Sequence, residues 1–214
     1  MTINNIKIFN KKEILLLNKL LISNFNDDKI HNLMTNKNLD KTGKKAGFYK
    51  KSAVLCLLEP DRKNNTYNII LTERSKKLKD HAGQISFPGG KLEFIDNASY
   101  KKCAYREAAE EIGFDKDKIN YLGKLNKYLT GTGYLIQPIV VIGINNQKLK
   151  HSSNEVTRIL HLPVNHLLFN KNIDKIFYNS DNKYYYSITW NKFEIWGATA
   201  KILIDLFRIL KNLW

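Results

Sequence analysis

Three glutamates that lie close together in the sequence could bind a divalent cation. Glu107, Glu110 and Glu111 fall within a helical pattern from about Asn97 to Ile112, and at about 100° per residue they share one helix face. Carboxylates in this arrangement repel one another, and the C-terminal end of a helix disfavours anions. Because a hard cation prefers carboxylate oxygens, the pattern indicates a metal site. The alternative is a solvated acidic helix face.

Two neighbouring features favour the metal site. Gly89 and Gly90 form a tight turn that can bring the backbone beside the helix, where the Gly90 carbonyl could contribute to metal binding. Arg106 stands next to Glu107 and could orient the carboxylates through a charge-assisted hydrogen bond. We therefore expect Gly90, Arg106 and the three glutamates to act together.

The segment from Arg106 to Phe114 reads Arg-Glu-Ala-Ala-Glu-Glu-Ile-Gly-Phe, and it resembles the Nudix box. The resemblance implies a Nudix-like α/β/α sandwich in which the glutamates at 107, 110 and 111 hold Mg²⁺ or Mn²⁺. It also implies that Gly90 is the box glycine, that Arg106 is the orienting arginine, and that water attacks a phosphorus atom of a nucleoside diphosphate derivative.

The front half of the box departs from the family pattern. Fifteen residues separate Gly90 from Arg106, two more than is usual in the family. The acidic residue of this half could be either Glu93 or Asp96. Asp96 also stands where the N-cap of the helix belongs, so it could serve only to begin the helix.

A second resemblance narrows the substrate. The stretch Leu71–Ser75, followed by Lys79, His81, Gly83 and Phe87–Gly90, looks like the extra signature of the coenzyme A pyrophosphatase branch, with lysine at 79 where arginine is usual. Three later stretches are also similar to that branch: Gly133–Val141, Asn154–Val156 and Ile195–Ala200. The resemblance implies hydrolysis of coenzyme A to 3′,5′-ADP and 4′-phosphopantetheine.

Coenzyme A carries a diphosphate and a 3′-phosphate, so its site needs cations in addition to the metal. Arg74, Lys77 and Lys79 precede the glycine turn and could bind these phosphates. His81 could be a general base or could order its loop by a hydrogen bond. Glu155, just before an expected strand, could be a carboxylate that activates water.

Charge and composition leave two alternatives open. The chain has 214 residues, a formal net charge of +15 and a pI of about 9.6, which suits a polyanionic partner. The substrate could be NADH, ADP-ribose or a nucleotide sugar. The chain could also be a basic nucleic-acid-binding module on a decayed hydrolase fold, although an acidic helix without metal would repel phosphate. We expect a small-molecule diphosphate, no specific nucleic acid and no membrane partner.

The elements that must position these residues mix strands and helices without regular alternation. The patterns predict helices over 10–23, 97–112 and 198–213, and a short helix opened by Pro163. They predict strands at 53–58, 67–72, 85–87, 121–129, 134–144, 158–162, 175–178 and 184–189. The fold class is α/β (α+β), with a mixed sheet between helices in one domain over residues 46–214. Residues 1–45 form an N-terminal helical extension.

The two cysteines and the N-terminal sequence predict the cellular compartment of the protein. Cys56 lies in an apolar run and Cys103 in a helical pattern, so both are expected to be buried free thiols in a reducing compartment. No signal-peptide pattern and no apolar run of membrane-spanning length is evident. We expect a cytoplasmic protein.

Overall fold

The computed structural model describes most of the chain. The described residues are 8–25, 30–32, 49–78, 81–144, 147–152, 154–168, 173–177 and 184–213. Lys79 therefore lies outside the described residues, and the expected extension 1–45 is described only in part. In the described part of the chain, no helix is long and apolar enough to cross a membrane.

The helices and strands occur in mixed order along the chain. The α-helices are α1 (Lys11–Asn24), α2 (Tyr100–Ile112) and α3 (Gly197–Leu210). Short 3-10 helices are η2 (Phe94–Asp96), η3 (Lys116–Lys118), η4 (Val164–Leu168) and η6 (Lys211–Leu213). The strands are β1 (Ile30–Asn32), β2 (Lys50–Asp61), β3 (Thr66–Arg74), β4 (Ile85–Ser86), β5 (Gly89–Lys91), β6 (Ile119–Lys124), β7 (Lys127–Leu129), β8 (Tyr134–Gly143), β9 (Val156–Pro163), β10 (Ile173–Phe177), β11 (Tyr184–Trp190) and β12 (Phe193–Trp196).

Within the described residues the main sheet has nine strands and is mixed. Its central path runs β1-β7-β8-β2-β3-β4, with β5 paired to β2, β6 to β8 and β9 to β3. The pairs β1–β7 and β2–β8 are parallel and the others are antiparallel. A separate antiparallel sheet has the order β10-β11-β12.

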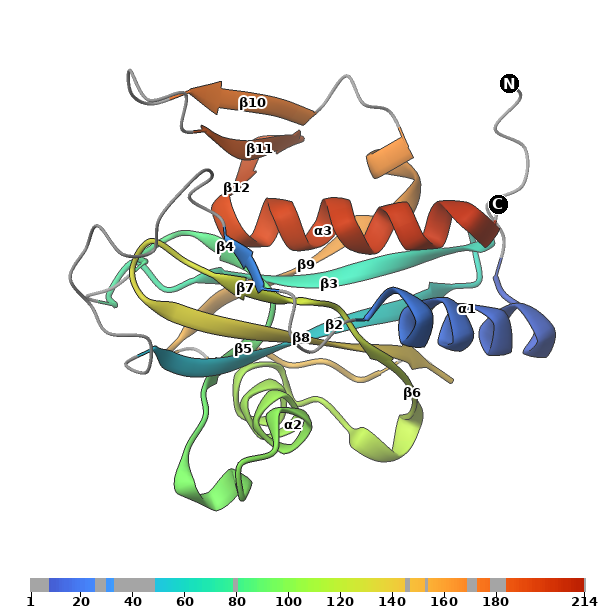
Figure 1. Ribbon diagram of the computed structural model, residues 1–214, viewed down its shortest axis with the longest axis horizontal. Helices are drawn as coiled ribbons and strands as arrows, with labels where there is room; N and C mark the ends of the chain where they lie inside the picture. Colours follow the sequence, from blue (N-terminus) through green and yellow to red (C-terminus); the bar gives the residue numbers. More distant parts are fainter. Residues whose placement is uncertain are drawn as a thin grey trace.

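Helices cover both faces of the main sheet. Helix α2 lies against one face, and α1 and α3 lie against the other, with the small sheet beyond α3 (Figure 1). The alternation along β2 explains this arrangement, since Leu55 and Leu57 pack in the core on the α2 side while Cys56 and Leu58 pack in the core with α1 and α3. The predicted α/β/α sandwich with a mixed sheet is confirmed.

The start of α2 differs from the prediction. Ser99 is the N-cap and its hydroxyl accepts a hydrogen bond from the Lys102 N–H at 3.3 Å, so the prediction that Asp96 caps the helix was wrong. Asn97 and Ala98 have φ angles of 49° and 59°, which a right-handed helix does not permit. The helix therefore begins at Tyr100, after a turn that Asp96 closes. Its end is as predicted, with Gly113 in the left-handed conformation.

Gly89 and Gly90 were expected to form a tight turn after the strand 85–87, and that expectation was wrong. Gly89–Lys91 forms β5 and pairs with Ser52–Val54 of β2. A side chain on Gly89 would collide with the backbone of Ala53 and Val54, so the close approach of the two strands requires glycine there. This short strand carries Gly90 to the edge of α2.

Other differences are smaller. The predicted strand 121–129 is divided into β6 and β7, and β12 completes a small sheet of which only two strands were predicted. Helix α3 ends at Leu210 and continues as η6, and the residues at i, i+3, i+4 and i+7 along it are buried: Leu203, Leu206, Phe207 and Leu210. Both cysteines are buried free thiols, as predicted.

Candidate active site

The three glutamates of α2 stand in different environments although they share one face of the helix. Glu111 is buried, with 3% of its surface exposed, while the side chain of Glu110 is 59% exposed and that of Glu107 is 14% exposed. The face therefore runs from the interior of the protein to solvent. A solvated acidic surface would not bury one of its three carboxylates and cover most of another.

Glu111 binds the backbone of β5. Its Oε2 accepts a hydrogen bond from the Gly89 N–H at 3.1 Å, and its Oε1 lies 3.8 Å from Nη1 of Arg74. Burial raises the pKa of Glu111 to about 7, and the charges of Glu107 and Glu155 act in the same direction. The Gly89 hydrogen bond and Arg74 oppose this rise only in part. This carboxylate therefore lacks a full counter-charge within the protein.

Glu107 lies against Gly90. A methyl group added to Gly90 would overlap the Glu107 carboxylate, so the absence of a side chain creates the space that this carboxylate fills. Burial raises the pKa of Glu107, and Arg106 opposes the rise. Gly90 and Glu107 are thus neighbours, in agreement with the prediction that the glycine segment brings the backbone beside the helix.

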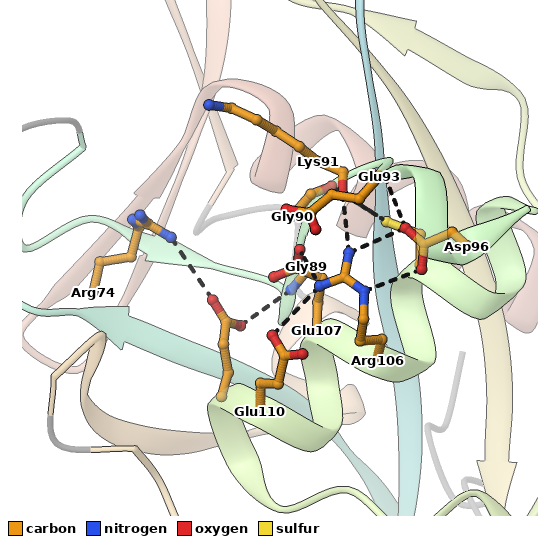
Figure 2. Close-up of polar contacts among 11 residues, drawn as sticks. Arg74, Gly89, Gly90, Lys91, Glu93, Asp96, Arg106, Glu107 and Glu110 are labelled. Atoms are coloured by element: carbon orange, nitrogen blue, oxygen red, sulfur yellow. Dashed lines mark hydrogen bonds and ion pairs between the residues drawn. The ribbon is translucent and has the colours of Figure 1, made fainter. Parts of the chain in front are cut away.

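Arg106 links the turn after β5 to the carboxylates (Figure 2). Its Nε donates to Asp96 Oδ1 at 3.0 Å and its Nη2 donates to Asp96 Oδ2 at 3.1 Å and to the Lys91 carbonyl at 3.2 Å. Its Nη1 lies 3.0 Å from Glu107 Oε1 and 3.4 Å from Glu110 Oε2. The orienting contact predicted between Arg106 and the carboxylates is present.

The structure distinguishes the two candidates for the front acid. Asp96 is buried, accepts two of the hydrogen bonds that Arg106 donates, and also accepts the Glu93 N–H at 2.9 Å. The Arg106 guanidinium holds the pKa of Asp96 below its ordinary value. Glu93 is exposed and contributes this backbone donor. Asp96 is thus the acid in contact with the site, and its partner is Arg106.

Cys103 is a contributor that the sequence analysis missed. Its buried thiol donates to the carbonyl of Lys91 at 3.3 Å and lies 3.6 Å from the carbonyl of Gly90. Burial, followed by the charge of Asp96, raises the pKa of this thiol to about 12, so it stays protonated. The thiol fastens β5 to α2. The sequence places Cys103 on the same helix as the three glutamates, but it does not show that the Cys103 thiol contacts β5.

The donor chemistry of α2 fits a divalent cation. Among the described residues, no group of three or more His, Cys, Asp or Glu side chains forms a metal site with the side chains as they stand, since Glu107 and Glu110 both lie against Arg106. A cation would nevertheless meet carboxylate oxygens of buried, mutually repelling groups. The cation would reduce the repulsion between these negative charges, so the carboxylates of α2 suit a divalent cation.

The remaining predicted residues surround this centre. His81 Nδ1 lies 2.9 Å from Gln84 Oε1, which matches the predicted loop-ordering contact. Glu155 is exposed, and its carbonyl accepts the Ser75 N–H at 2.8 Å, which places it next to the end of β3. Lys77 is exposed on the turn after β3, and the predicted site residue Lys79 lies outside the described residues.

A cavity of about 840 Å³ opens beside the glutamates. Arg74 and Gly90 line it, and the same two residues contact Glu111 and Glu107 respectively. Its walls continue between the main sheet and the start of α3, where Tyr185 and Trp196 face it. Sites for small molecules typically have volumes of about 300–1,000 Å³. The arrangement can therefore hold a diphosphate at its edge and a large substituent inside.

Comparison with known proteins gives a consistent assignment. The model of the NUDIX domain matches residues 49–172. The chain is 31% identical to the uncharacterized Nudix hydrolase NudL of Yersinia pestis over 156 residues, which is 72% of this chain and 74% of that protein. The corresponding protein of Citrobacter koseri is 31% identical over 140 residues, 64% of this chain and 72% of its own length. A MutT/nudix family protein from Enterococcus faecalis shares the fold, with a TM-score of 0.50, 13% identity, and coverage of 83% of this chain and 65% of that one.

Proposed function

Because the chain belongs to the Nudix family, we propose that it hydrolyses the diphosphate bond of coenzyme A or its derivatives. Family membership makes the protein a pyrophosphohydrolase that acts on nucleoside diphosphate derivatives. The proposal concerns which derivative is the substrate and which residues act on it. It rests on the cavity that borders the acidic face of α2.

The reaction adds one water molecule across the P–O–P linkage. The water oxygen bonds to one phosphorus, the bond from that phosphorus to the bridging oxygen breaks, and the bridging oxygen stays with the other phosphate. The products of coenzyme A are then 3′,5′-ADP and 4′-phosphopantetheine. Mg²⁺ or Mn²⁺, when bound, would supply neutralisation of the charge on the diphosphate and lower the pKa of water.

The residues of the chain have separable tasks in this proposal. Glu107, Glu110 and Glu111 would hold the cation, and the Gly90 backbone would border it. Arg106 is a positioning residue because Asp96 fixes its orientation and its Nη1 contacts two of the carboxylates. These tasks require the α2 face and β5 to keep their present separation, which the Cys103 thiol supports.

Arg74 would bind the diphosphate. Its guanidinium lies at the edge of the cavity, 3.8 Å from Glu111, and its buried Nε has no hydrogen-bond partner in the structure. A phosphate oxygen in the cavity would accept a charge-assisted hydrogen bond from the part of the guanidinium that is accessible there. The Glu155 backbone lies beside the end of β3, and the charge of its side chain acts on Glu107 and Glu111. It is our candidate for activating water.

The cavity is the observation that favours coenzyme A over smaller diphosphates. Arg74 and Gly90 belong both to the cavity and to the acidic centre, so a diphosphate held there leaves one substituent inside the cavity. A volume of about 840 Å³ exceeds what a phosphate group needs. The similarity of Leu71–Ser75 and Ile195–Ala200 to the coenzyme A pyrophosphatase branch gives independent support, and both stretches contribute residues to the cavity wall.

A substrate panel tests the proposal. The protein is incubated with Mg²⁺ and with coenzyme A, NADH, ADP-ribose and a nucleotide sugar, and the products are identified by mass. We expect the highest kcat/KM for coenzyme A, with 3′,5′-ADP and 4′-phosphopantetheine as products. Faster cleavage of NADH or ADP-ribose would overturn the substrate while leaving the family chemistry intact. The variant Glu107→Gln controls for contaminating hydrolases.

A further inference from the structure

The cavity has walls of a distinct chemical character beyond its charged edge. Arg74 and Lys91 supply positive charge where the cavity meets the acidic centre. Apolar side chains such as Val54 and Ile136 also line the cavity, together with the rings of Tyr185 and Trp196, whose centroids lie 5.7 Å apart. Such surfaces favour a neutral, largely apolar group.

Hydroxyl groups are placed among these apolar walls. Ser52 projects from β2, Thr132 from the turn before β8 and Thr199 from the first turn of α3, and all three line the cavity. The Ser52 hydroxyl already donates to the Leu135 carbonyl at 3.5 Å, and Thr132 Oγ1 lies 3.0 Å from Thr130 Oγ1. Because a hydroxyl oxygen has two lone pairs, each can still accept a hydrogen bond from an amide N–H. The cavity therefore combines apolar contact with scattered hydrogen-bonding groups suited to a flexible chain that contains amides.

The two halves of coenzyme A differ in how they match these walls. The pantetheine arm is uncharged and carries two amides, a hydroxyl and methyl groups. The other half carries a 3′-phosphate on its ribose, and moving a phosphate among apolar walls costs free energy because its hydration is lost. Charge complementarity thus directs the arm into the cavity and keeps the nucleotide half toward the edge.

We propose that the cavity binds the pantetheine arm of the substrate and that the walls around Thr132 and Ala198 determine which groups on the arm's sulfur are accepted. This inference rests on the proposed function, since it assigns one half of coenzyme A to one place. It adds that hydrolysis is sensitive to bulk on the sulfur and tolerant of bulk on the adenine. The volume of about 840 Å³ leaves space for a short acyl group.

The test uses substrates enlarged at opposite ends. Hexanoyl-coenzyme A adds bulk at the sulfur, and 1,N6-etheno-coenzyme A adds bulk at the adenine. Two variants fill the cavity from different elements of its lining: Thr132→Phe on an exposed turn and Ala198→Phe at the start of α3. Thr189→Phe is the matched control, because Thr189 is an exposed residue of β11 outside the cavity lining.

We expect each filling variant to raise KM for hexanoyl-coenzyme A by roughly tenfold or more, since an apolar pocket discriminates by about that factor against a group that no longer fits. The ratio of kcat/KM between etheno-coenzyme A and coenzyme A should stay as in the wild type. Thermal unfolding identifies a variant that does not fold. Because Thr132 and Ala198 lie on different elements, failure of one variant to fold leaves the other available for the test.

The outcomes separate this inference from the function on which it rests. Unchanged KM for coenzyme A and its hexanoyl thioester in a folded filling variant would show that the arm lies elsewhere. Selective loss with etheno-coenzyme A would place adenine against Tyr185 and Trp196, and would equally overturn the inference. Failure of the wild type to cleave coenzyme A in the substrate panel would instead refute the proposed function.

Discussion

Arg106 and Asp96 are joined by two parallel hydrogen bonds, with Nε to Oδ1 at 3.0 Å and Nη2 to Oδ2 at 3.1 Å. The third guanidinium nitrogen is thereby directed to Glu107 at 3.0 Å. A planar guanidinium held on one edge presents its other edge in a fixed direction. The turn that contains Asp96 therefore controls the position of a carboxylate on α2.

Replacing Asp96 by asparagine should reduce activity by loosening Arg106. One of the two charge-assisted hydrogen bonds is lost, at a cost of about 1.5–3 kcal/mol. We expect a fall in kcat larger than the change in KM, together with a lower thermal midpoint. Glu93→Gln is the matched control, since Glu93 is exposed and its backbone makes the contact with Asp96. A larger loss in the control would identify Glu93 as the functional acid.

Glu110→Gln should leave the fold intact and remove most of the activity. The side chain is 59% exposed, so the substitution costs little stability. Loss of one carboxylate from the cation site should lower kcat by about a hundred- to a thousandfold, which corresponds to several kcal/mol at the transition state. Turnover is measured at saturating Mg²⁺ beside circular dichroism. Wild-type turnover would refute the assignment of this residue to the cation.

The metal-free protein should become less stable as pH rises from about 4 to about 7. The pKa of Glu111 is raised by burial to about 7, against about 4.3 in an unfolded chain. Between these values the folded state binds more protons than the unfolded state, so the free energy of unfolding falls with increasing pH. The contribution is fully present below about pH 4 and is lost as pH passes about 7.

Thermal unfolding in a chelator, from pH 5 to pH 8, measures this effect. Glu111→Gln should reduce the dependence of the thermal midpoint on pH. Glu110→Gln should leave this dependence unchanged because its side chain is exposed. Excess Mg²⁺ should stabilise the wild type more at pH 8 than at pH 5.5, since cation binding requires ionised carboxylates. Parallel slopes in the wild type and Glu111→Gln would contradict the prediction.

Arg74→Ala should weaken hydrolysis of coenzyme A and of 3′-dephospho-coenzyme A by the same factor. Arg74 lies 3.8 Å from Glu111, and in the proposed function it binds the diphosphate common to both substrates. Loss of a charge-assisted hydrogen bond of about 1.5–3 kcal/mol corresponds to a decrease of roughly ten- to a hundredfold in kcat/KM. Lys77→Ala, on the exposed turn, should have little effect. A loss confined to coenzyme A would move Arg74 to the 3′-phosphate.

The parts of the fold that the sequence predicted are those with strong apolar periodicity. The apolar residues of α3 recur at helical spacing and are buried on one side of the helix, whereas the continuous apolar run Ala53–Leu58 of β2 is buried on both faces of the sheet. The start of α2 was predicted wrongly because Asp96 is a good N-cap residue by type. The Asp96 side chain instead accepts hydrogen bonds from Arg106, and Ser99 is the N-cap of α2.

The site was predictable where it follows from one helix and unpredictable where it depends on packing. The shared face of Glu107, Glu110 and Glu111 follows from helical geometry. Their differing burial does not, because it depends on how β5 lies against α2. The contacts of Cys103 with β5 arise in the same way. Pairing of Gly89–Lys91 with β2 was the missing step.

Gly90→Ala should reduce turnover without destabilising the fold. The added methyl group would overlap the Glu107 carboxylate, which must then turn away from β5. Displacement of a catalytic group by about 1 Å can lower the rate by about a hundredfold. Gly133→Ala is the matched control. Gly133 has a φ of 81° and open space around its Cα, so alanine there should cost about 1 kcal/mol of stability and leave turnover near the wild-type value.

A double variant shows whether the effect passes through Glu107. If the methyl group acts only by displacing this carboxylate, adding Gly90→Ala to Glu107→Gln should cost little further activity, because the group it displaces has already been replaced. Residues that act on one contact show such non-additive effects. If the two losses multiply, Gly90 acts independently of Glu107, and the space that the missing side chain leaves for the Glu107 carboxylate is not what the glycine provides to the reaction.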